Sequence, residues 1–235
     1  MPFRVFAGMT SVHSIMRSLI YVNHIRDRSR WNFIIIALAL LCFPATALCE
    51  ACNDYENTRD EIKSKLTIDP KMRSVFFASH ESSYPWYIIR HEDGTFESVI
   101  EGKISEQDKE PVEHTSNCIS THQGHHIMEF ADATYDSGVL TLEISGGMPA
   151  YFSSLRIIVK GVDFLCQFKG VYPAPVSNCK RNIITKKLIF KDREIKKGKR
   201  LFAWLSVEFE ETSTYKGVTE TGRHKIEGYI KPVVK

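Results

Sequence analysis

The sequence predicts a mainly β fold, an antiparallel β-sandwich or barrel with one short N-terminal helix, which follows a signal peptide or signal anchor. Three observations predict it. Segments of alternating apolar and polar residues recur from residue 70 onward, glycine-containing turns separate them, and almost no later segment has a helical period. The chain has 235 residues, 25% of them charged and 43% hydrophobic. This composition excludes a disordered tail, a collagen, a coiled coil and a multi-span membrane protein.

The first 47 residues have the three parts of a secretory signal. A basic segment with five arginines and one acid, Asp27, precedes the apolar run WNFIIIALALLCF, and the small-x-small site Ala45-Thr46-Ala47 follows the run. We therefore expect cleavage after Ala47. Residues 48–235 would then form a single extracytoplasmic β-rich domain.

An uncleaved signal anchor is the alternative, because hydropathy separates a short anchor from a cleavable signal poorly. Residues 31–48 would then hold the chain in an inner membrane, and translation could also start at Met16. In both cases the basic residues precede the apolar run, so the positive-inside rule places the rest of the chain outside the cytoplasm. We expect a periplasmic or secreted protein whose membrane contact is made by the N-terminal segment alone.

The first expected element of the domain is a short helix over residues 54–66, which Asn53 or Asp54 would cap. Residues 74–79, with the sequence SVFFAS, predict the first strand because period-two alternation begins there. The change of period near residue 70 therefore marks the start of the β-rich body.

A hairpin is expected over residues 87–100, because Asp93-Gly94 is a typical hairpin turn. Residues 101–116 are polar and unpatterned, so we expect a long exposed loop there. The aromatic group Tyr84, Pro85, Trp86 and Tyr87 precedes the hairpin. It could line a ligand groove, although aromatic residues at such a position more often belong to a core.

Seven further strands are expected, at residues 126–131, 139–145, 155–161, 164–170, 183–191, 201–211 and 224–234. The turns between them are expected at Asp136-Ser137-Gly138, Gly146-Gly147, Gly161, Lys197-Gly198 and Thr221-Gly222. In the strand 201–211, alternation gives one apolar face, made of Leu201, Ala203, Leu205, Val207 and Phe209. Phe202 and Trp204 fall on the other face, so either both faces are covered or an aromatic patch is exposed.

The six cysteines predict disulfides, since an extracytoplasmic compartment is oxidising. Cys166 and Cys179 flank a turn-rich segment, which predicts a bridge between them. Cys52 with Cys118 is the second expected bridge. A redox motif at Cys49-x-x-Cys52 is an alternative, but it lacks the strand before it and the helix after it that such a motif needs.

Histidines are concentrated in one short window, where His114, His122, His125 and His126 lie within thirteen residues of one another. Imidazole and carboxylate ligands suit zinc and copper, so either ion is a possible cofactor. The candidate ligands are His122, His125, His126 and Glu129. If this segment is a strand, the ligands divide between its two faces, which favours a polar loop entering an edge strand without a cofactor.

Charge is unevenly distributed along the domain. Residues 81–113 carry nine acids and three bases, whereas residues 176–200 carry ten bases and two acids. A basic patch could bind an acidic partner or an envelope ligand, with Lys186, Lys187, Lys191, Lys196, Lys197, Lys199 and Arg200 as its members. The alternative is a solvated hairpin, since Ile184, Leu188 and Phe190 interleave with the lysines as core residues do.

No catalytic signature occurs in the chain: G-x-S-x-G, H-E-x-x-H, the P-loop and G-x-G-x-x-G are all missing. We therefore expect a non-enzymatic extracytoplasmic binding or interaction protein with an unidentified protein or envelope ligand as its partner. A metal-binding protein or metal-dependent enzyme that uses the window from His114 to Glu129 is one alternative, and a membrane-anchored subunit of an envelope assembly is another.

Nucleic acid is not an expected partner, because no basic-aromatic module accompanies the charge. The formal charge of +3 also belongs to the targeting segment, where five arginines face one acid. The expected domain over residues 48–235 carries 26 bases and 27 acids and is close to neutral.

Overall fold

The computed structural model describes residues 52–172 and 176–235. The predicted signal over residues 1–47 and the possible anchor over residues 31–48 lie outside these ranges, so both stay predictions. Within the described ranges, no helix is long and apolar enough to cross a membrane.

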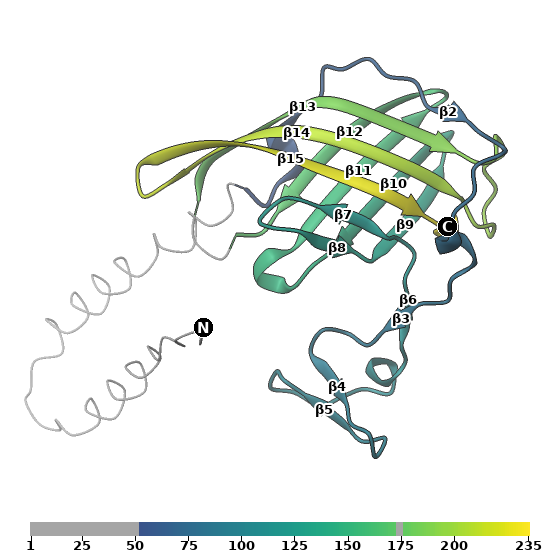
Figure 1. Ribbon diagram of the computed structural model, residues 1–235, viewed down its shortest axis with the longest axis vertical. Helices are drawn as coiled ribbons and strands as arrows, with labels where there is room; N and C mark the ends of the chain where they lie inside the picture. Colours follow the sequence, from purple (N-terminus) through teal and green to yellow (C-terminus); the bar gives the residue numbers. More distant parts are fainter. Residues whose placement is uncertain (1–51, 173–175) are drawn as a thin grey trace, which may run out of the picture. The chain divides into compact units, whose positions relative to one another are not determined.

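The described residues form a mainly β structure with two large sheets (Figure 1). The first sheet has the order β1-β13-β14-β15-β7-β8, with β2 also paired to β13. Its strands are β1 (Thr58–Arg59), β2 (Thr67–Ile68), β7 (Cys118–Ser120), β8 (His126–Met128), β13 (Ser177–Phe190), β14 (Ala203–Tyr215) and β15 (Val218–Ile230). The short strands β1 and β2 run parallel to β13, whereas the remaining pairs are antiparallel.

The second sheet is an antiparallel meander in the order β12-β11-β10-β9. Its strands are β9 (Phe130–Asp136), β10 (Val139–Gly146), β11 (Ser153–Lys160) and β12 (Asp163–Gly170). Tight turns connect β9 to β10 at Ser137-Gly138 and β11 to β12 at Gly161, where positive φ angles favour glycine. The helix η4 (Pro149–Tyr151) connects β10 to β11.

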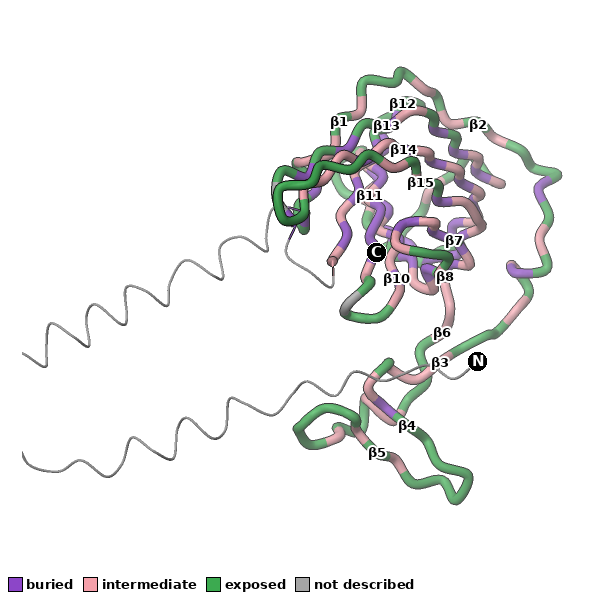
Figure 2. Tube along the Cα trace, turned by 60° about the vertical axis from the view of Figure 1, so that its left-hand side comes forward, coloured by how far each residue is buried: buried purple, intermediate pink, exposed green. Residues whose placement is uncertain are grey.

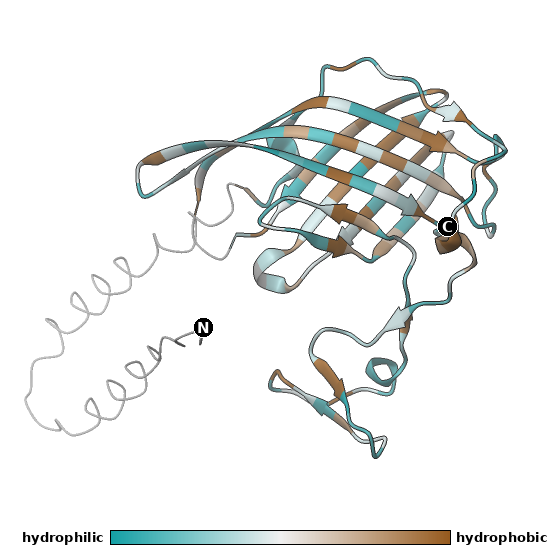
Figure 3. Ribbon diagram, in the orientation of Figure 1, coloured by the Kyte–Doolittle hydropathy of each residue, from teal (hydrophilic) through white to brown (hydrophobic). Residues whose placement is uncertain are grey.

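One hydrophobic core lies between these sheets, which together we call the two-sheet body. Hydrophobic and hydrophilic residues alternate along the first part of β14 (Figure 3), as expected for a strand with one buried face. The predicted inward face of residues 201–209 is confirmed, because Leu201, just before β14, and Ala203, Leu205, Val207 and Phe209 of β14 are all buried. Phe209 packs against Phe168 of the second sheet with ring centroids 4.5 Å apart. In the described residues neither sheet closes on itself, so the barrel alternative is wrong.

The predicted strand over residues 74–79 is wrong, since Val75–Ala78 form the 3-10 helix η2. Ser74 caps it by accepting a hydrogen bond from the backbone N–H of Phe76. The turn lets two consecutive aromatic side chains face the body: Phe76 is buried, and the Phe77 ring lies 4.9 Å from that of Phe202. η2 therefore covers part of the outer aromatic face of β14.

The predicted helix over residues 54–66 is reduced to one 3-10 turn, η1 (Tyr55–Asn57), which Asp54 caps as expected. Tertiary contacts hold the next residues extended instead. Thr58 bonds through its hydroxyl to the backbone of Phe168, and the Asp60 carboxylate accepts from the backbone N–H of Cys166. These contacts outweigh the weak helical periodicity of the segment.

Two further differences concern the long strands. The hairpin between β14 and β15 turns at Lys216-Gly217, where both φ angles are positive, and the predicted turn at Thr221-Gly222 lies within β15. A β-bulge between Ile183 and Thr185 also shifts the alternation of β13, so Ile183 is buried in place of the predicted Ile184.

A smaller β segment, which we call the arm, extends over residues 84–111 (Figures 1 and 2). It contains the predicted hairpin at Asp93-Gly94, between β4 (Ile88–Arg90) and β5 (Phe96–Ser98), and the 3-10 helix η3 (Gln107–Lys109). Figure 2 shows that most of the arm is exposed, with Ile88 as its buried residue. The predicted long loop over residues 101–116 is thus interrupted by η3 and by a short strand.

The arm joins the body through β3 (Ser82–Ser83) and β6 (Val112–Glu113), which pair with each other and which we call the arm root. Lys231, 1% exposed, donates to the backbone oxygen of Ser79 at 2.5 Å and lies 3.4 Å from the Glu113 carboxylate. Arg200 forms a second ion pair with Glu113 at 2.7 Å. Two cations from the body therefore fix one carboxylate of the arm root.

Candidate ligand-binding groove

A groove of about 1070 Å³ lies where the arm root meets the edges of both sheets. Its walls come from the start of the arm, from the corner at which β8 continues into β9, and from the turn after β10. Its apolar lining includes Tyr84, Trp86, Val112, Ile127, Phe130, Met148 and Tyr151. This volume is at the upper end of the range for small-molecule sites.

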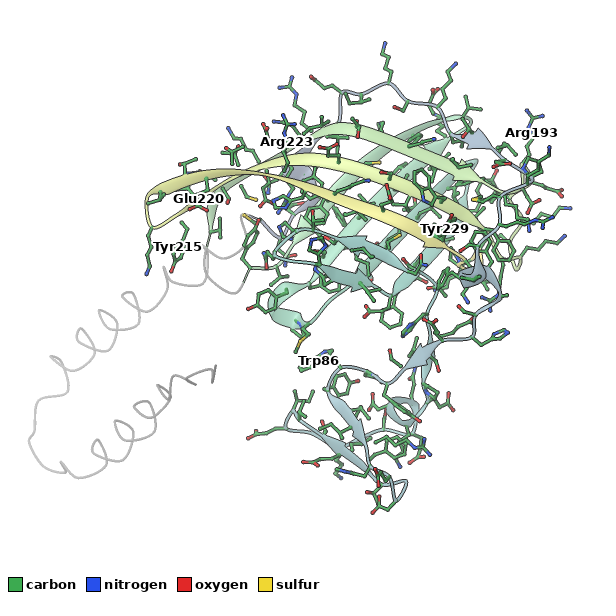
Figure 4. All side chains as sticks on the ribbon, in the orientation of Figure 1. Trp86, Arg193, Tyr215, Glu220, Arg223 and Tyr229 are labelled. Carbon is green, nitrogen blue, oxygen red and sulfur yellow. The ribbon has the colours of Figure 1, made fainter. Side chains whose placement is uncertain are left out.

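Exposed apolar side chains gather in this groove. Trp86 is 51% exposed, Ile127 52% and Met148 61%, and all three line it. Trp86, labelled in Figure 4, precedes the β4–β5 hairpin. Large exposed apolar residues that share one concave surface typically mark a binding site.

Two glycines bring the backbones close together beside the groove. A Cβ atom at Gly146 would lie 2.4 Å from the Cα of Met128, and one at Gly147, where φ is +96°, would lie 2.5 Å from the backbone oxygen of Tyr151. Neither position admits a side chain without movement of the neighbouring backbone. The predicted turn at Gly146-Gly147 is confirmed, and it sets the close approach of β10 to β8.

Two buried polar atoms of the groove lining have no hydrogen-bond partner among the described residues: Oε1 of Gln123 and Nε2 of His126. The amide nitrogen of Gln123 donates to the backbone oxygen of Val171 at 3.0 Å, which identifies Oε1 as an acceptor. His126 bonds to the backbone of Gly124, and burial lowers its pKa. A neutral imidazole has one donor nitrogen and one acceptor nitrogen. Because the hydrogen bond to Gly124 uses the donor, Nε2 is the second acceptor beside the Gln123 oxygen.

The carboxylates of the groove differ in their pairing. Glu113 is held by Arg200 and Lys231, and Asp132 pairs with Lys235 at 2.5 Å. Glu129 has no ion-pair partner in the described part of the chain. Its charge raises the pKa of His126, but burial lowers that pKa by more, so the net change is a decrease. The residues that line the groove therefore carry two unpartnered acceptor atoms, both buried, and one carboxylate without an ion-pair partner among the described residues.

A second polar cluster lies inside the body. His122, 1% exposed, donates to the hydroxyl of Tyr172 at 2.9 Å, and Tyr172 donates to Glu211. Arg181 binds the same carboxylate through Nε at 2.6 Å. A small cavity of about 240 Å³ adjoins the cluster, with His224 on its wall.

Ser153, His122 and Glu211 lie in the order of a nucleophile, a base and an acid, but their geometry does not suit catalysis. The Ser153 hydroxyl is 3.4 Å from Nδ1 of His122, and Ser153 is 0% exposed. It does not line the neighbouring cavity. A nucleophile needs a place for the substrate beside its oxygen, so we interpret the cluster as a structural network that balances the Arg181 charge.

The four predicted metal ligands are not brought together. His122 belongs to the buried network, His125 is exposed, and His126 and Glu129 line the groove. The described residues contain no group of three or more His, Cys, Asp or Glu side chains able to hold a metal ion. The reason is that the His122 ring packs inside the body against Phe168 and Tyr172, whereas His126 and Glu129 line the groove.

Neither predicted disulfide is present, because Cys52, Cys118, Cys166 and Cys179 are all free, buried thiols. Cys166 lies in the main core beside Asp60 and Lys186, and its pKa is raised by burial. Cys118 lies under Gly228 of β15, and burial raises its pKa to about 12. Cys179 instead clusters with Cys52 and Val176, since β13 carries it to the N-terminal end of the described chain.

The predicted basic residues do not form one patch. Lys186 points into the body, where its Nζ lies 2.6 Å from Asp60, because it shares the buried face of β13 with Leu188 and Phe190. Lys187 and Lys191 lie over the rings of Trp204 and Phe202 on the outer face of the first sheet. Lys196 pairs with Glu194 at 2.6 Å, and Arg200 belongs to the arm root. Lys197 and Lys199 are exposed beside the turn at Gly198.

Three of the four residues that precede the hairpin line the groove, namely Tyr84, Pro85 and Trp86. Tyr87 does not, since its hydroxyl donates to Asp108 at 2.6 Å within the arm. The sequence allowed either a groove or a core position for these residues and favoured the core. The prediction missed Gln123, Met148 and Tyr151, which come from turns that no periodicity relates to the arm.

No protein-family model, curated protein or solved structure matches this chain.

Proposed function

We propose that this chain is a non-enzymatic binding protein of an extracytoplasmic compartment, and that the groove is its binding site. The observation that carries the proposal is the convergence of exposed apolar side chains with two unpartnered buried acceptors in one concave site. The compartment rests on the signal-like segment over residues 1–47. Two sheets around one core support an antiparallel β-sandwich as the fold that carries the site.

The ligand class follows from the polar groups. Gln123 Oε1 and His126 Nε2 are acceptors, so they require a ligand that donates hydrogen bonds. Glu129 lines the same groove without a cationic partner among the described residues, so a positive charge on the ligand would be favoured. The apolar walls suit an extended hydrocarbon or aromatic body. We therefore propose an apolar molecule that carries a protonated amine.

Isothermal titration calorimetry with dodecylammonium below its micelle concentration tests this function. The matched probes are dodecanoate and dodecanol, which have a similar chain and a different head group. We expect saturable binding of dodecylammonium and binding at least about tenfold weaker for both controls, since a charge-assisted hydrogen bond contributes about 1.5–3 kcal/mol. Equal affinity for all three probes would contradict recognition of the amine, and no binding of any probe would contradict the groove as their site.

The two alternative functions have less support. A metal-dependent role needs converging ligands, which the described part of the chain does not bring together. A membrane-anchored assembly subunit depends on residues 31–48, outside the described ranges, and stays a prediction.

A further inference from the structure

Cys52 and Cys179 form a pair of neighbouring thiols that the binding function does not use. They lie in one small buried cluster with Val176, against which Tyr172 packs, and a hydrogen bond joins the two thiols. Cys52 precedes η1, whereas Cys179 lies on β13. The two ends of a long stretch of chain therefore meet at these sulfur atoms.

The surrounding polar groups hold both cysteines in place. Arg181 donates from one guanidinium nitrogen to the backbone oxygen of Cys52 at 2.9 Å and from another to the Glu211 carboxylate at 2.6 Å. The Cys179 thiol lies 3.6 Å from the same carboxylate. One arginine and one glutamate thus fix the backbone of one cysteine and the side chain of the other.

We propose that Cys52 and Cys179 are the disulfide-forming pair of this protein, oxidised by an exchange partner that carries a reactive disulfide. Both cysteines are 3% exposed in the folded domain, so the exchange takes place before the cluster is closed. This inference does not depend on the binding function of the groove.

The chemistry is a two-step thiol–disulfide exchange. The thiolate of one cysteine of the pair attacks one sulfur of the partner's disulfide, forms a mixed disulfide and releases the other partner sulfur as a thiolate. The other cysteine then loses its proton and attacks the first cysteine's sulfur, which forms the Cys52–Cys179 bond and releases the second partner thiolate. The cysteine pair loses two protons and two electrons, and the partner's disulfide takes up the two electrons.

In the folded cluster, Cys179 is the more acidic thiol of the pair. The hydrogen bond from Cys52 lowers the pKa of Cys179 and raises that of Cys52, and the nearby Arg181 charge also favours the Cys179 thiolate. Cys118 and Cys166 have raised pKa values and lie elsewhere in the core, so they are the matched controls.

The test uses the full chain exported to an oxidising compartment and denatured in N-ethylmaleimide without a reductant. We expect digestion and mass spectrometry to give a Cys52 peptide linked to a Cys179 peptide, with Cys118 and Cys166 alkylated. Cys118→Ala and Cys166→Ala should keep the linked peptide, and Cys52→Ser should lose it and leave Cys179 alkylated.

A second measurement keeps the proposal testable if a variant folds poorly. The reduced wild-type chain, unfolded and then refolded in oxidised glutathione, should form the same link, with a thermal midpoint above that of the reduced protein. Alkylation of both Cys52 and Cys179 in these two samples, or a link from either one to any other cysteine, would overturn the proposal.

Discussion

The Nζ atom of Lys186 lies 2.6 Å from the Asp60 carboxylate inside the body, where the two side chains are 1% and 5% exposed. Lys186 also donates to the backbone oxygen of Phe164 at 2.6 Å, and Asp60 accepts from the backbone N–H of Cys166. The inner face of β13 and an extended N-terminal segment thus combine to bury a compensated ion pair.

Removal of one partner of this pair should destabilise the domain strongly. Asp60→Ala leaves the Lys186 charge buried without compensation, so we expect the free energy of unfolding to fall by about 3–5 kcal/mol. Urea denaturation followed by far-UV circular dichroism measures the loss. The neighbouring pair of Arg59 and Glu61 is exposed, so Arg59→Ala should change stability by less than about 1 kcal/mol. Equal losses for the two variants would show that burial of the pair is not decisive.

Ile127 and Ile119 give a matched test of the groove. They are paired across β8 and β7 and are 52% and 49% exposed, but Ile127 lines the groove and Ile119 does not. We expect Ile127→Ser to weaken dodecylammonium binding roughly fivefold or more, since about 1–2 kcal/mol of apolar contact is lost. Ile119→Ser should leave the calorimetric affinity unchanged, and a comparable loss in both variants would argue for nonspecific association with the sheet surface.

Glu129 should determine the preference for a cation. Glu129→Gln keeps the size of the side chain and removes its charge, so we expect dodecylammonium to bind about tenfold more weakly while dodecanol binding stays the same. Calorimetry with both probes measures the preference. Asp132→Asn is the control, because Asp132 already pairs with Lys235. A larger effect of the control than of Glu129→Gln would contradict the proposed role of Glu129.

His126 should make the domain less stable in mild acid. Burial lowers its pKa in the folded state, so the neutral ring contributes stability above the ordinary histidine value of about 6.5, and this contribution is lost as the pH falls through the lowered folded value. We expect the pH dependence of unfolding between about pH 7 and pH 5 to be shallower in His126→Gln than in the wild type. The exposed His125 gives the comparison: His125→Gln should keep the wild-type slope.

The arm root should weaken at lower pH. The hydrogen bond from Arg200 lowers the pKa of Glu113, so this carboxylate stabilises the folded state above the ordinary glutamate value of about 4.3 and loses that effect as the pH falls through its lowered value. We expect the hydrogen-exchange protection factors of β3 and β6, taken against the intrinsic exchange rate at each pH, to fall below about pH 4. Glu113→Gln should show fast exchange at neutral pH as well, and protection equal to that of the wild type would contradict the role of the ion pair.

Sequence periodicity predicted the parts of the fold that depend on one buried face. In β14, alternation identified Leu205, Val207 and Phe209 correctly, because a strand with one covered face has no other register that buries them. Alternation alone also places Lys186 on the buried face with Leu188 and Phe190, but the prediction put this lysine on the surface, because the Asp60 carboxylate that compensates its charge comes from a distant segment. Periodicity failed at residues 74–79, where two adjacent aromatic residues contact the body from a turn.

The candidate site was predictable only in part, because its residues are related by the fold and not by spacing. Tyr84 and Trp86 attracted attention as an aromatic group, and His126 and Glu129 as candidate metal ligands. Their common surface exists because Gly146 and Gly147 let β10 approach β8, a contact between separate segments that no local pattern reports. The contact between Cys179 and Cys52 likewise joins two segments that are far apart in the chain, so no local sequence pattern reports it.

The most direct test of the binding groove uses the indole N–H signals of Trp86 and Trp204 in a two-dimensional ¹H–¹⁵N NMR spectrum. Trp86 lines the groove, whereas Trp204 lies on the outer face of the first sheet. We predict that dodecylammonium, added below its micelle concentration, shifts the Trp86 signal in a saturable way and leaves the Trp204 signal in place. An unchanged Trp86 signal at saturating probe, or equal shifts of both signals, would contradict the groove as the binding site.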